Sequence, residues 1–117
     1  MRDERGSATV LAGFAIVAIL VVGLGILQFG SVVAARHRAQ SAADLGALAA
    51  AGAVVEGDAA ACAAAGVVAT RMSVDVTACE VDGWDVVVTV STHVDLAPFG
   101  RRTVAAIARA GPVEGAE

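Results

Sequence analysis

The chain has few of the large side chains from which most hydrophobic cores and substrate pockets are built. It contains no tyrosine, three phenylalanines and one tryptophan, although hydrophobic residues make up 57% of its 117 residues. Small residues such as alanine and valine therefore carry the apolar fraction. Burying them gains little free energy, because the gain follows apolar area at about 25 cal/mol per Å². A small domain of this composition needs a covalent cross-link or partner subunits to be stable.

Ionisable side chains are absent from the stretch between Gly6 and Ala35. An α-helix needs about 20 apolar residues to cross a bilayer, and residues 8–27 supply that length with Thr9 as the one polar side chain. A cleaved secretory signal is the alternative, but its apolar region is shorter. The stretch therefore predicts a retained membrane span. Arginines flank it on both sides, so the positive-inside rule does not decide its orientation.

Lysine is absent too, and the chain after the apolar stretch is acidic. The eight basic side chains are all arginine, and the formal net charge is −4. An acidic surface repels phosphate backbones, so we expect no nucleic-acid partner. The simpler interpretation is a solvated face that keeps a small domain soluble.

Two cysteines, Cys62 and Cys79, are present at a spacing that no common metal motif uses. Zinc ligands usually come in pairs about two to four residues apart, so we expect no metal site. In an oxidising compartment the simpler interpretation is one intrachain disulfide, which favours a position outside the cytoplasm for this part of the chain. The alternative is a pair of buried free thiols.

A helical pattern continues beyond the apolar stretch to about Val55. One face of this segment is formed by Ser41, Leu45, Leu48, Gly52 and Val55. A neighbouring face carries an alanine at every fourth position, namely Ala35, Ala39, Ala43, Ala47 and Ala51. Rows of small side chains let helices approach closely, so we expect these alanines in helix packing. The alternative is that alanine is simply the best helix former.

The last third of the chain changes from helical to alternating periodicity. Asp58 is placed to cap a second helix over residues 59–72. Two valine-rich strands follow, over residues 74–79 and 84–90, and Asp82-Gly83 between them suits a type I′ hairpin turn. A third strand is expected over residues 103–110, after a turn at Pro98-Phe99-Gly100.

The predicted hairpin turn fixes a register for the first two strands. It pairs Val81 with Trp84, Cys79 with Val86, and Thr77 with Val88. These side chains then share the face that packs on a helix, and Cys79 points toward Cys62.

No catalytic constellation is present in the sequence. His37 stands among arginines and His93 at the end of a predicted strand, so both are interpreted as structural or solvated. A phosphate-binding glycine loop, a nucleophile elbow and a zinc-protease motif are all absent from the sequence. We therefore expect no enzymatic activity, no cofactor and no small-molecule substrate.

Three segments together resemble the TadE/TadG-like proteins of tight-adherence pilus systems. Residues 5–11 (RGSATVL) open the apolar run, and residues 36–51 are similar to the family's Arg-x-x-x-Gln-x-Ala-Ala-Asp stretch, with Gly46 replacing one alanine. The third and weaker segment is the cysteine pair followed by the valine-rich hairpin and residues 108–112. The combination resembles the short TadE-like subgroup encoded near secretion ATPase genes.

This resemblance implies kinship with type IV pilins and pseudopilins. Such subunits wait in the membrane, are clipped by a prepilin peptidase, and are drawn into a filament by an ATPase-driven platform. Gly6 and Ser7 match the position of that cleavage. Leu11 departs from the pattern, since pilins usually carry a glutamate five residues after the cut.

The sequence thus predicts an α+β protein with a long transmembrane helix that continues into a small pilin-like domain. That domain has a second helix and a two- to three-stranded antiparallel sheet. The expected segments are a candidate leader (1–6), a transmembrane helix (7–35), its continuation outside the membrane (36–56), a small α+β domain (57–111) and a tail (112–117).

The expected function is that of a single-pass minor pilin or pseudopilin in the bacterial cell membrane, with its C-terminal domain outside the cytoplasm. Its expected partners are the lipid bilayer, other pilin-like subunits, the pilus or secretion platform and a prepilin peptidase. The alternative is a small single-span envelope scaffold or regulator without a pilus role.

Overall fold

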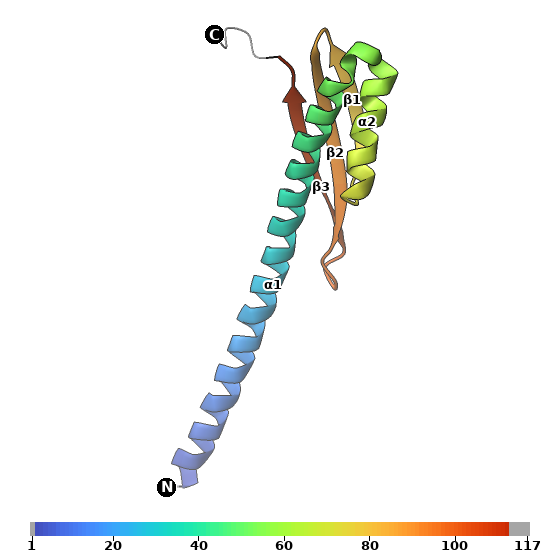
Figure 1. Cartoon of the computed structure of the whole chain (residues 1–117). Helices are drawn as coiled ribbons and strands as arrows, with labels where there is room; N and C mark the ends of the chain where they lie inside the picture. Colours follow the sequence, from blue (N-terminus) through green and yellow to red (C-terminus); the bar gives the residue numbers. More distant parts are fainter. Residues whose placement is uncertain (1, 113–117) are drawn as a thin grey trace. The chain divides into compact units, whose positions relative to one another are not determined.

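The structure, a computed structural model, describes residues 2–112, with side chains from Arg5 onward. Its elements are α1 (Arg2–Gly52), the 3₁₀ turn η1 (Val54–Glu56), α2 (Asp58–Arg71), β1 (Asp75–Asp82), β2 (Asp85–Asp95) and β3 (Arg101–Ala110) (Figure 1). The predicted α+β class is confirmed. Met1 of the candidate leader and residues 113–117 of the predicted tail lie outside the described residues.

The chain divides into two units, which we call unit 1 (Met1–Ser31) and unit 2 (Val32–Glu117). Among the described residues, α1 is the one helix long and apolar enough to cross a membrane, and its most apolar 18 residues have a mean hydropathy of 2.9. Two polar side chains of unit 1 bond back to their own helix: the Thr9 hydroxyl donates to the Arg5 carbonyl at 3.1 Å, and the Ser31 hydroxyl donates to the Leu27 carbonyl at 3.0 Å. Polar groups in the hydrocarbon region of a bilayer need hydrogen-bond partners within the protein, and these bonds provide them.

Unit 2 contains a three-stranded antiparallel sheet in the order β1-β2-β3. Along the central strand β2, alternate side chains point to one buried face. Val86, Val88 and Val90 on that face are fully buried and are the largest side chains in the chain to be so. The core is therefore built from small aliphatic groups, as the composition predicts.

Both α2 and the part of α1 that belongs to unit 2 lie against this buried face of the sheet (Figure 1). The three elements approach one another at Gly46 of α1. A Cβ atom placed there would lie 3.7 Å from the Ala65 carbonyl oxygen of α2 and 3.7 Å from Cγ1 of Val88 in β2. Only small side chains fit where three elements approach so closely, and the buried helical positions in unit 2 are accordingly alanines and one glycine.

The β1–β2 hairpin has a different register from the one predicted. Val81 pairs with Val86 and Cys79 with Val88, so the two loop residues are Gly83 and Trp84. A type I′ turn at Asp82-Gly83 would require positive φ at both residues, including one with a side chain. In the observed turn only Gly83 has positive φ, at +63°. Trp84 is consequently 61% exposed.

Two further local expectations are wrong. The Thr77 side chain does not share the core face, because the pairing shifts between Val76 and Ala78 and leaves Thr77 exposed. Asp58 does not cap α2: the cap residue is Gly57, and no side chain bonds the free N–H groups. Asp58 instead lies in the first helical turn, where its charge still complements the helix dipole.

Candidate interaction surfaces

The two cysteines form one disulfide that ties α2 to β1. Cys62 and Cys79 are 17 residues apart in sequence, with Cα atoms 5.9 Å apart. Both side chains are half-buried beside the core. The expected pairing is confirmed, and the shifted register does not disturb it because Cys79 keeps its place on the inner face of the sheet.

The alanine row of α1 lies inside unit 2 rather than on its surface. Ala39, Ala43 and Ala47 are completely buried, Ala35 is 8% exposed, and Ala51 is half-buried. Of these, Ala35, Ala39, Ala43 and Ala47 belong to the core cluster that the helix forms with the chain's own sheet and second helix. In this fold the row serves close packing within the chain.

The neighbouring face of α1, which we call the leucine face, is left uncovered. It consists of Ser41, Leu45, Leu48, Gly52 and the adjoining Val55, all of them exposed. Leu45 is 50% exposed, Leu48 62% and Val55 74%. An apolar row of this kind on one helix is typical of a surface that a partner covers.

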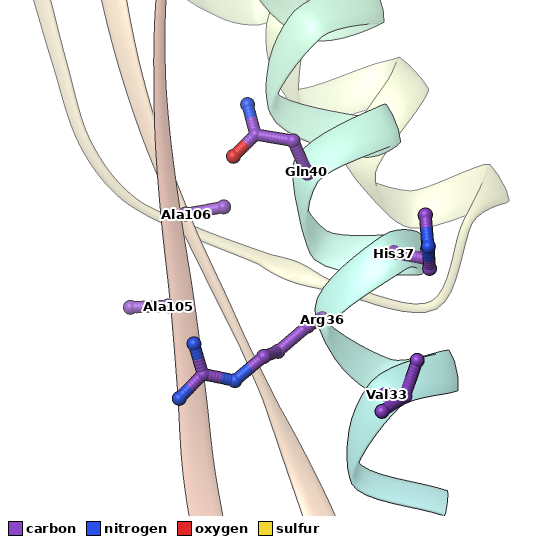
Figure 2. Close-up of a pocket in the computed structure, with 6 residues that line it drawn as sticks. All are labelled: Val33, Arg36, His37, Gln40, Ala105 and Ala106. Atoms are coloured by element: carbon purple, nitrogen blue, oxygen red, sulfur yellow. The ribbon is translucent and has the colours of Figure 1, made fainter. Parts of the chain in front are cut away.

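A groove of about 360 Å³ runs between α1 and β3 in unit 2. Its lining residues are Val33, Arg36, His37, Gln40, Ala105 and Ala106 (Figure 2). Figure 2 shows the Arg36 side chain extending toward β3. Gln40 closes the groove above, where its amide Nε2 donates to the Ile107 carbonyl at 3.5 Å and to Asp44 at 3.0 Å. Sequence reasoning missed this groove, since it depends on which strand lies beside the helix.

The remaining polar contacts of unit 2 are exposed. Arg109 donates to Asp85 Oδ2 through Nε at 3.0 Å and also through Nη2, across β2 and β3. The hydrogen bond to Asp85 raises the pKa of Arg109, and the negative charge of Asp85 is the second cause. His93 Nδ1 lies 3.2 Å from the Thr103 hydroxyl. Within residues 5–112, no three His, Cys, Asp or Glu side chains gather closely enough to hold a metal ion.

The comparisons with known proteins bear on the helix that carries these surfaces. The Flp pilus-assembly TadE/G-like family matches residues 6–53, from the start of the apolar stretch to the end of α1. This segment is similar to the TadE/G-like family. The resemblance drawn from the two sequence segments within it is confirmed, and the matched segment includes both the alanine row and most of the leucine face.

A curated protein is also similar to part of this chain. The chain is 57% identical over 53 residues to a Mycobacterium tuberculosis protein described as apoptosis inhibitor Rv3654c. Those residues are 45% of this chain and cover 63% of the relative, which is less than two thirds of its length. No solved structure shows a significant match to this chain.

Proposed function

We propose that the chain is a membrane-anchored TadE-like minor pilin or pseudopilin that acts in assembly of a tight-adherence (Flp, type IV-like) pilus or a related secretion apparatus. The observation that carries this proposal is the uncovered leucine face within the family-matched part of α1. Leu45 and Leu48 are at least half exposed there, on the helix whose first part is apolar enough to span a bilayer. Water-exposed leucines at successive helical turns favour burial against another helix.

The proposed role is structural rather than enzymatic, as the family's part in pilus assembly suggests. Because the alanine row is already buried, contacts with other pilin-like subunits would use the leucine face instead. The Cys62–Cys79 disulfide supports a position of unit 2 outside the cytoplasm, since disulfides persist in oxidising compartments.

A matched pair of positions tests the leucine face. Leu48 on α1 is 62% exposed and Val67 on α2 is 55% exposed, so both are accessible apolar side chains on helices. A photo-reactive amino acid at position 48 should cross-link to pilus or platform proteins in cells, and one at position 67 should not. Equal labelling at the two positions, or pilus assembly unaffected by Leu48→Arg, would reject this surface.

Processing is a separate part of the proposal. Cleavage by a prepilin peptidase between Gly6 and Ser7 would leave a mature chain that begins at Ser7. Amino-terminal sequencing of the protein purified from membranes measures this directly. A mature chain that keeps Arg5 and Gly6 would show that the subunit acts without such cleavage, and copurification with the pilus platform would then decide the role.

A further inference from the structure

The end of unit 2 at which the chain enters from unit 1 carries the β2–β3 connection. Arg36 and Ala105 line one groove between α1 and β3, and Leu48 and Ala110 line another farther along. The helix and this strand therefore run in the same direction. Residues 96–100, which precede β3, lie at the end where α1 enters unit 2 (Figure 1).

The connection also extends past the first helical turn of unit 2. From Ala105 back to Arg101, a strand covers about 13 Å at about 3.3 Å per residue. From Arg36 back to Val32, a helix covers about 6 Å at about 1.5 Å per residue. The tip of the connection thus lies farther toward this end of unit 2 than the helical turn that contains Val32.

The tip presents an aromatic side chain to the outside. Phe99 is 81% exposed, more than any other large hydrophobic side chain of the described residues. The turn that carries it is closed by backbone hydrogen bonds: the Leu96 N–H donates to the Gly100 carbonyl at 2.8 Å, and the Phe99 N–H donates to the Leu96 carbonyl. Gly100 permits this turn with a φ of +94°. Leu96 packs against the core, so Phe99 projects from an anchored turn.

Charge is segregated between the two ends of unit 2. Exposed arginines gather at the end with Phe99, and we call this set the basic end: Arg36, Arg38, Arg71, Arg101 and Arg102. Two acidic residues, Asp75 and Asp95, also lie at the basic end, so its net charge is +3. The opposite end holds six acidic residues and Arg109, and Arg109 forms an ion pair with one of them, Asp85. Its acidic residues are Asp44, Glu56, Asp58, Glu80, Asp82 and Asp85.

We propose that the basic end docks onto anionic phospholipid headgroups of the membrane that α1 spans, with Phe99 at the interface. Guanidinium groups bind phosphate through paired hydrogen bonds, and basic residues near an anionic leaflet are attracted to it. The five arginines make no ion pair with a described residue, so they are free to meet phosphate. This inference rests on the membrane anchor alone and not on the pilus role.

The single native tryptophan offers a matched probe. Trp84 lies in the β1–β2 turn at the acidic end and is 61% exposed. The full chain is reconstituted in vesicles of phosphatidylcholine with or without phosphatidylglycerol, with bromine on the acyl chains as a quencher. In the variant Phe99→Trp/Trp84→Phe, fluorescence should be quenched when phosphatidylglycerol is present and less so at high salt. In the native chain, Trp84 should remain unquenched throughout.

A pair of arginine substitutions tests the charge. Arg102→Gln and Arg109→Gln make the same chemical change at opposite ends of unit 2. Arg102→Gln should lower the docked-to-free ratio about fivefold, and Arg109→Gln should leave it unchanged. Amide hydrogen exchange of the native chain provides a readout without substitution. The amides of residues 96–102 should exchange more slowly in vesicles with phosphatidylglycerol than in vesicles without it.

Two outcomes overturn the proposal. One is equal exchange and equal quenching in neutral and anionic vesicles. The other is protection that follows the protein-to-lipid ratio rather than the phosphatidylglycerol content, which would show that the acidic end of a second copy covers the basic end.

Discussion

Removal of the Cys62–Cys79 disulfide tests how unit 2 is stabilised. The bond closes a loop of 17 residues between α2 and β1. In the chain-entropy description, closing a loop of this size stabilises the folded state by about 3 kcal/mol. A unit of about 85 residues is expected to have a total unfolding free energy of about 4 to 13 kcal/mol. The disulfide is therefore a large fraction of the total, in a core whose largest fully buried side chains are valines.

The variant Cys62→Ala/Cys79→Ala should lose about 3 kcal/mol of unfolding free energy. The assay is urea unfolding of the full chain in lipid vesicles that contain no other protein, measured by tryptophan fluorescence. Because Trp84 is the one tryptophan and tyrosine is absent, the signal comes from unit 2 alone. A reductant should reproduce the loss in the native chain and change nothing in the double variant. A double variant within about 1 kcal/mol of the native chain would refute the entropic argument.

Three further substitutions probe the packing of unit 2 in the same assay. Gly46→Ala should raise the unfolding free energy by about 1 kcal/mol, because alanine favours the helix and its Cβ would make ordinary 3.7 Å contacts; a decrease would show that the space around Gly46 is tighter than these contacts indicate. Val88→Ala should cost about 2 to 3 kcal/mol, and the half-exposed neighbour Val87→Ala well under 1; equal losses would contradict the assigned inner face. Leu48→Ser should change stability by less than about 0.5 kcal/mol, so that an assembly defect in a Leu48 variant can be separated from misfolding.

The long apolar helix, the elements of unit 2 and the disulfide were predictable from sequence, because each follows from a local pattern. A stretch without charges predicts the span, and alternating valines predict the strands. The inner face of the hairpin was predicted correctly for Cys79 and Val86. Its pairing was not, because the choice between two adjacent turns depends on which residue takes positive φ, and only the observed turn confines this to Gly83.

The sequence could not show which face of α1 turns inward. Both the alanine row and the leucine face are apolar, and hydrophobicity alone favours burial of the larger side chains. The close approach of α1, α2 and β2 at Gly46 reverses that preference, since leucine would not fit between them. Likewise, the grouping of Arg36 with Arg102 depends on strand direction and length, which a linear pattern does not encode.

The participation of α1 in the core has a mechanical consequence. The helix whose first part is apolar enough to span a bilayer also supplies, through residues 35–50, about two fifths of the buried positions among the described residues of unit 2. Any force that pulls on the anchor during extraction from a bilayer is therefore transmitted into the core without an intervening linker. The sheet and α2 alone would lack one wall of the core, because cutting the chain after Gly52 would remove the buried alanines of α1.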